Sequence, residues 1–108
     1  MGGEQALAIG LGHMELFAAI GALSPSRPRE VADQVAKASA DAKTVNAKMK
    51  TLWIACGRQD PQHLNASRQI AETLDQHGVK RVHFETEGAH NYAIWQQQML
   101  EFLPLLFR

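Results

Sequence analysis

The sequence lacks the features of a disulfide-rich, membrane-spanning or nucleic-acid-binding chain. It has a single cysteine, Cys56, so no internal disulfide can form. No apolar run approaches the roughly 20 residues that cross a bilayer, and we expect no membrane partner. Lysine plus arginine equals aspartate plus glutamate, 11 each. Without a basic stripe we also expect no nucleic-acid partner.

Two further patterns are missing. Residues 1–5 have no basic region followed by an apolar stretch, so they do not resemble a signal peptide, and the sequence leaves the localisation open. Four of the five histidines show no ligand spacing with one another or with the cysteine. We interpret these four as structural or surface side chains: His13, His63, His77 and His83. We expect neither a metal nor a cofactor.

What the chain does contain is typical of a folded domain. Apolar residues make up 45% and charged residues 20%, a balance that separates it from disordered chains. A length of 108 residues suits one small domain.

The first half of the chain predicts a helix, a strand and a connection of undecided structure. Small and apolar residues over 2–12 predict a buried helix with Gly12 as its expected stop. The apolar run 16–23 has the length of a strand covered on both faces, although periodicity alone does not exclude a helix. Prolines and serines then mark a loop. The alanine-rich remainder of 24–50 predicts one or two surface helices or, with equal weight, a mobile or lid-like connection.

Residues 51–87 predict a strand, a helix and a second strand. The apolar run 51–56 has the length of a buried strand. A helix over 63–77 follows, because apolar residues recur every fourth position on one face, and Gly78 is its expected stop. Residues 81–87 alternate between apolar and polar side chains, which predicts a half-exposed strand near a sheet edge.

The last helix is the most regular amphipathic segment. We expect its apolar stripe to consist of Tyr92, Trp95, Met99, Phe102 and Leu106. Pro104 should kink this helix or weaken its last turn. Strands and helices that alternate with short loops predict right-handed crossovers. The fold class is therefore α/β, with about three parallel strands flanked by helices.

Two polar residues follow neighbouring strands of the predicted sheet. Asp60 comes after the strand that ends at Cys56, and His90 after the strand that ends near Glu87. Functional groups gather beyond the C-terminal ends of parallel strands, so this carboxylate and imidazole can meet there. An aspartate before proline is more often a turn residue, and a loop histidine is more often solvated. Position alone leaves these interpretations open.

Three stretches resemble one enzyme family. Residues 1–7, Met-Gly-Gly-Glu-Gln-Ala-Leu, look like the segment after the nucleophile in a Gly-x-Ser-Met-Gly-Gly elbow. Residues 53–60 look like an acid-bearing strand and turn. Residues 88–95, continuing to 102–107, look like a histidine loop and a terminal helix. In this order they resemble the C-terminal half of the esterase family within the α/β-hydrolase superfamily, which includes feruloyl and acetyl-xylan esterases.

The resemblance implies a fold and a function. The whole chain would be the C-terminal portion of one α/β-hydrolase domain, with the acid and the histidine in residues 51–108. It implies a serine carboxylic-ester hydrolase that acts on a small ester through an acyl-enzyme. Asp60 and His90 would be the acid and the base of its Ser-His-Asp triad. The backbone N–H of Met1 would be an oxyanion donor, since the residue after the nucleophile supplies it.

The nucleophile is where the chain departs from the family. The serine would immediately precede Met1, so this chain alone is expected to be inactive. No serine of the chain sits in an elbow context: Ser24, Ser26, Ser39 and Ser67. The chain is then a fragment or one polypeptide of a divided enzyme, which we favour, or a short gene product. Its expected partners are the missing N-terminal half or a second copy.

The competing hypothesis is a truncated, non-catalytic binding or assembly module. Acyl and alcohol specificity cannot be read, because much of the pocket would lie outside the chain.

Overall fold

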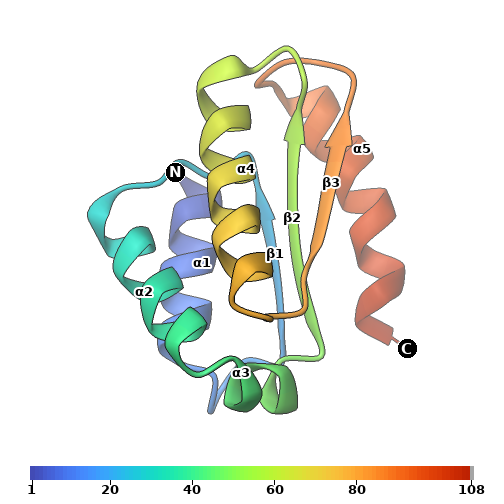
Figure 1. Ribbon diagram of the computed structural model, residues 1–108. Helices are drawn as coiled ribbons and strands as arrows, with labels where there is room; N and C mark the ends of the chain where they lie inside the picture. The colour runs from blue at the N-terminus through green and yellow to red at the C-terminus, as the bar shows by residue number, and fades with distance from the viewer. Residues whose placement is uncertain (108) are drawn as a thin grey trace.

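A computed structural model describes residues 1–107 and orders them around a three-stranded parallel sheet (Figure 1). The strands lie in the order β1-β2-β3, with bounds of Ala19–Leu23, Thr51–Gly57 and Val82–Thr86. Both strand pairs are parallel, and β2 is the central strand. The α/β class and the parallel sheet predicted from the sequence are therefore confirmed.

Helices cover both faces of the sheet (Figure 1). Helices α1 (Gly2–Gly12), α2 (Arg29–Ala40) and α4 (Pro61–Gln76) form one layer, and the short α3 (Ala42–Lys48) closes its lower end. Helix α5 (Tyr92–Phe102) lies on the opposite face. The α-helix ends at Phe102, and the chain continues through Pro104 as a 3-10 helix, η1 (Leu103–Phe107), where the sequence predicted a kink or a weakened last turn. Within residues 1–107 no helix is long and apolar enough to cross a membrane.

Alternating residues of β2 pack into two separate cores. Leu52 and Ile54 contact the layer of α1, α2 and α4. Trp53 and Ala55 face α5, where the Trp53 ring lies 5.2 Å from the ring of Phe102 between centroids. Both faces of β2 are buried, which explains why its sequence is a continuous apolar run.

The beginning of the chain differs in part from the sequence prediction. Helix α1 has the predicted bounds, but it is buried on one side only: Leu7 is inaccessible, whereas Ile9 is 53% exposed. Strand β1 begins at Ala19 rather than at Leu16. The backbone N–H groups of Leu16 and Phe17 both donate to the carbonyl of His13, so this apolar stretch is curled into a turn and cannot join the sheet.

The undecided stretch forms two helices. Helix α2 packs against both α1 and α4 and buries Val31 and Val35 almost completely. The helical interpretation of this stretch is confirmed. A lid role for residues 24–50 stays a prediction, and the packing of α2 into the main core does not favour it.

The inward face of α5 is not the predicted stripe. Gln98 and Phe102 are buried, whereas Tyr92 is 75% exposed and Met99 is 39% exposed. Phe102 fills a notch above Gly21, where a Cβ atom would lie 2.5 Å from its ring. Seating Phe102 in this notch turns Gln98 toward the sheet and Met99 toward the surface.

Candidate active site

The loops that follow β2 and β3 run side by side at the C-terminal edge of the sheet. The N–H of Arg58 donates to the carbonyl of Thr86 at 2.7 Å. The N–H of Gln59 donates to the carbonyl of Gly88 at 2.9 Å. The parallel ladder thus continues beyond the strands, and each loop is paired with the other before its functional side chain is reached.

Two glycines permit this close approach. A Cβ atom on Gly57 would collide with the carbonyl of Gly88, and one on Gly88 would collide with the side chain of Ile94. Gly88 also has a φ of +121°, which residues with a side chain rarely adopt. The spacing of the two loops therefore requires glycine at position 57, and the backbone conformation and the contact with Ile94 require glycine at position 88.

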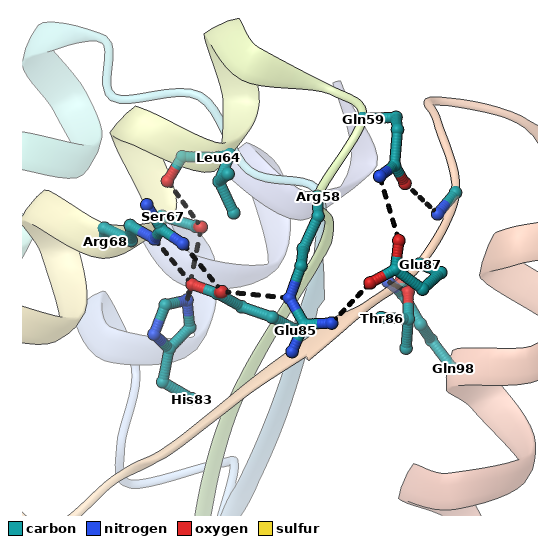
Figure 2. Close-up of polar contacts among 11 residues, drawn as sticks. Arg58, Gln59, Leu64, Ser67, Arg68, His83, Glu85, Thr86, Glu87 and Gln98 are labelled. Atoms are coloured by element: carbon teal, nitrogen blue, oxygen red, sulfur yellow. Dashed lines mark hydrogen bonds and ion pairs between the residues drawn. The ribbon is translucent and has the colours of Figure 1, made fainter.

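Gln59 links the loops a second time through its side chain (Figure 2). Its Oε1 atom accepts a hydrogen bond from the backbone N–H of Gly88. Its Nε2 atom donates to Oε2 of Glu87 at 2.9 Å. Gln59 therefore holds the histidine-bearing loop by backbone and side chain together.

Arginine and glutamate side chains extend this linkage to α4 (Figure 2). Arg58 donates to Glu87 at 2.6 Å, and its Nε atom lies 3.7 Å from Glu85. Arg68 of α4 makes two hydrogen bonds to Glu85, at 2.7 and 2.8 Å. The hydrogen bond from Arg68 is the main reason that the pKa of Glu85 is lowered. The middle of α4 and the end of β3 are thereby fixed relative to each other.

Asp60 and His90 meet at this edge of the sheet, as the sequence predicted. Oδ2 of Asp60 lies 2.7 Å from Nδ1 of His90. The Asp60 side chain is 8% exposed and the His90 side chain 37% exposed. An ionised carboxylate only accepts hydrogen bonds, so Nδ1 carries the proton and Nε2 is the basic atom. An imidazole held in this way can take up and deliver a proton at Nε2.

His63 belongs to the same cluster, and the structure corrects our interpretation of it as a structural or surface residue. Its Nδ1 atom lies 2.8 Å from Oδ1 of Asp60. Its ring stacks on that of His90, with centroids 4.2 Å apart and 17° between planes. The missed signal is the spacing Asp-x-x-His at the helix start, which matches the two reciprocating positions of a capping box.

Asp60 uses both carboxylate oxygens for imidazoles. It is the N-cap residue of α4, yet its side chain accepts no hydrogen bond from the helix backbone. Burial by itself would raise the pKa of Asp60, but the hydrogen bonds from His63 and His90 outweigh burial, and the net pKa is lowered. The carboxyl is therefore ionised at neutral pH, as an acceptor of two N–H groups must be.

Trp95 and Ser24 support His90 on another side. The rings of Trp95 and His90 meet edge to face, with centroids 4.8 Å apart and 86° between planes. The indole N–H of Trp95 donates to Oγ of Ser24 at 3.1 Å. Ser24 is 2% exposed and has a φ of +51° directly after β1. Its hydroxyl positions the indole, a role that the sequence did not indicate.

A cavity of about 340 Å³ adjoins His90 and Trp95. Its other walls are Met1, Gly2, Gly3, Gly21 and Leu23. Met1 is the N-cap of α1 and is 80% exposed. The first backbone N–H groups of a helix have no acceptor within the helix. The N-terminus of α1 and the imidazole of His90 therefore border one space, which suits chemistry that needs N–H donors beside a base.

Comparisons with known proteins agree with this fold. A family whose description reads "Putative esterase" matches residues 1–106. Among solved structures, a ferulic acid esterase matches with a TM-score of 0.81 and 21% sequence identity. The match covers 96% of this chain and 47% of that one, so the chain spans about half the length of the esterase. The shared architecture is part of an α/β-hydrolase fold.

Proposed function

The chain belongs to the putative esterase family, and we propose that it is the acid- and base-bearing part of a serine carboxylic-ester hydrolase. The family and the similarity to a ferulic acid esterase support an enzyme of the carboxylesterase type. One observation carries the finer proposal. Asp60 and His90 lie 2.7 Å apart beside a cavity that the N-terminus of α1 also lines.

In the proposed mechanism a serine outside this chain attacks the carbonyl carbon of a small ester. Nε2 of His90 takes the hydroxyl proton and later gives it to the departing alcohol. Water then attacks the acyl-enzyme with the same base and releases the acid. Asp60 orients the ring and stabilises its imidazolium form.

Met1 is the proposed oxyanion donor. The resemblance of residues 1–7 to the segment after a nucleophile supports this role, because the residue after the nucleophile supplies such a donor. Met1 also borders the same cavity as His90. Removing one oxyanion donor lowers the rate of a well-studied protease by about 10²–10³-fold. The proposed donor and base thus come from opposite ends of the chain.

The nucleophile is proposed to come from the N-terminal half of the same enzyme. Within residues 1–107, no serine lines the cavity beside His90. Among the buried serines, Ser24 accepts the Trp95 N–H, and Ser67 donates to the carbonyl of Leu64 at 3.0 Å. The third, Ser39, lies on α2. The partner half would bring its serine to the N-terminus of α1.

The complete enzyme tests this proposal. We expect it to hydrolyse methyl ferulate or p-nitrophenyl acetate and to be labelled by a serine-directed fluorophosphonate on a residue outside these 108. His90→Ala and Asp60→Asn should each lower kcat at least about 10³-fold. His77→Asn, which changes an exposed histidine away from the cluster, should leave kcat unchanged.

The 108-residue chain by itself is expected to show no turnover above background. Turnover by this chain that His90→Ala abolishes would place the nucleophile within it and refute the mechanism. A complete protein that takes no fluorophosphonate label and hydrolyses no ester would support the non-catalytic binding module instead.

A further inference from the structure

We propose that Asp60, His63 and His90 form a binding site for one divalent transition-metal ion, with zinc as the best fit. The bound ion would inhibit hydrolysis, because it prevents His90 from accepting a proton and Asp60 from orienting it. The binding site follows from the geometry of the cluster. Only its inhibitory effect rests on the proposed function.

The three donor atoms already converge. One nitrogen or oxygen atom from each residue lies within 4.8 Å of the other two. Zinc bonds to imidazole nitrogen and carboxylate oxygen are about 2.0–2.2 Å long, so ligands of one ion lie within about 4 Å of one another. Tetrahedral zinc places neighbouring ligand atoms about 3.4 Å apart. The two Nδ1–carboxylate distances, 2.8 and 2.7 Å, would therefore lengthen by about 0.6–0.7 Å, and the widest separation in the cluster would shorten by about 1.4 Å.

The donor set selects the kind of ion. Two imidazoles and one carboxylate with an open position are a ligand set that zinc uses at catalytic sites. Imidazole also suits copper and nickel, whereas magnesium and calcium prefer oxygen ligands throughout. His63 and His90 supply two of the three donors here, so the cluster favours transition metals over the hard cations.

Binding requires a proton shift that explains the inhibition. The metal–nitrogen bond uses the lone pair of Nδ1, so the Nδ1 proton of each ring must leave. It moves to Nε2, and each imidazole remains neutral with one N–H. Nε2 of His90 then carries a proton and cannot accept one from a nucleophile. Asp60 is occupied by the ion and no longer orients the base.

The site is largely organised without an ion. The rings of His63 and His90 are stacked nearly parallel, which aims both Nδ1 atoms at one carboxylate. The Asp60 side chain is 8% exposed, and Gln59 fixes the loop that carries His90. Ligands that are already ordered lose less conformational freedom on binding.

Titration calorimetry of the untagged chain with zinc chloride tests the site. We expect one ion per chain. His63→Phe keeps a flat ring beside His90 but removes a ligand, and it should weaken binding at least about tenfold. His13→Asn is the control. His13 and Glu15 form an exposed pair of potential metal ligands, with Nδ1 of His13 3.0 Å from Oε1 of Glu15, and the loss of this pair should leave the affinity for zinc unchanged. No binding at millimolar zinc, or equal binding by His63→Phe, would overturn the proposal.

Nitrogen NMR of the wild-type chain gives a readout that does not depend on a folded variant. Zinc should shift the Nδ1 resonances of His63 and His90 and leave those of His77 and His83 in place. Shifts confined to other histidines would overturn the site.

Activity separates the two proposals. The complete enzyme should lose ester hydrolysis when zinc is added and regain it with a chelator. Full activity with zinc bound at the cluster would refute the inhibitory effect. Absence of hydrolysis without zinc would count against the proposed function alone, because the calorimetric result stands on its own.

Discussion

Asp60 is an N-cap residue whose carboxylate does not cap its helix. An aspartate at this position usually accepts a backbone N–H of the first turn, and losing such a cap costs about 1 kcal/mol. Pro61 follows at the first helical position, where its fixed φ favours the helix start. The carboxylate of Asp60 is thus free for His63 and His90. The start of α4 thus lacks the N-cap hydrogen bond, and the same carboxylate binds the two imidazoles of the candidate site instead.

Gln59 provides a prediction about the spacing of the two loops. We expect Gln59→Ala to lower the free energy of unfolding by about 1 kcal/mol, because hydrogen bonds to Gly88 and Glu87 are lost. Amide hydrogen exchange at Gly88 should become faster. Gln62→Ala is the matched control at an exposed glutamine and should change stability by less than about 0.5 kcal/mol. Urea unfolding and hydrogen exchange measure both variants, and equal effects would contradict the role of Gln59.

Glu85 provides a prediction about pH. Its pKa is lowered from 4.5, chiefly by the hydrogen bond from Arg68. A carboxyl group with a lower pKa in the folded state stabilises the fold above its unfolded value, and this stabilisation is lost as pH falls through the folded value. We therefore expect Arg68→Gln to lose stability less steeply than wild type between about pH 5 and pH 3. Arg29→Gln is the control, since Arg29 is 91% exposed and lies 3.9 Å from Asp33. Parallel acid-unfolding curves for Arg68→Gln and wild type would count against this linkage.

Helix α5 is held to the sheet by few side chains, and Phe102 is the main one. We expect Phe102→Ala to destabilise the chain by about 3 kcal/mol, because the aromatic ring contacts Trp53 and fills the notch at Gly21. Met99→Ala, three residues earlier on the exposed face, should change stability by less than about 0.5 kcal/mol. Thermal and urea unfolding compare the two. Comparable losses of stability in both variants would favour the stripe predicted from the sequence, which contains both residues.

Elements that depend on local sequence were predicted more closely than faces that depend on distant contacts. Helix α1 has the predicted bounds, and the left-handed Gly78, with a φ of +82°, follows α4 as expected. The stripe on α5 is right at Phe102 and wrong at Tyr92 and Met99, because the periodicity of apolar residues does not include the notch at Gly21, which comes from β1. Strand β1 was predicted to begin at Leu16, because this residue is apolar and continues the run. In the structure the N–H of Leu16 donates to the carbonyl of His13 in a turn, so the strand begins later.

The candidate site was predicted in part for the same reason. Asp60 and His90 were found because parallel strands bring their C-terminal loops together whatever the side chains are. Ser24 could not be found, because its role depends on a contact with Trp95, 71 residues away. His63 lay within reach of sequence reasoning through its spacing from Asp60. Interpreting it by metal-ligand spacing alone missed that local pattern.

The described residues are as compact as a folded chain of this length, and one edge of their sheet is apolar. Its radius of gyration is 12.7 Å, close to the roughly 13 Å expected for this length. Among the described residues, β1 pairs with β2 alone. A cavity of about 330 Å³ lies beside its other edge, with Ile9 and Phe17 in its walls. Unpaired strand edges with apolar neighbours recruit other chains.

Sedimentation velocity at micromolar concentration tests this edge. We expect the isolated chain to self-associate, or to bind the N-terminal half of the enzyme when both are present. Phe17→Asp should weaken either association, because Phe17 is 44% exposed beside β1. Leu100→Asp, on the outer face of α5 and 69% exposed, is the control and should not. A monomer with one cooperative thermal transition would contradict the expectation.

The continued pairing of the loops after β2 and β3 has a consequence for gene recombination. The alignment of Asp60 with His90 is set by the register of the sheet, and a slip of one residue would displace His90 by about 3.3 Å. A crossover near Lys50 would transfer both residues with their alignment intact. A crossover within α4 would join Asp60 from one parent to His90 from another. The pairing of β2 with β3 would then be formed by two sequences that had not evolved together. Related genes are therefore expected to exchange this segment as one block.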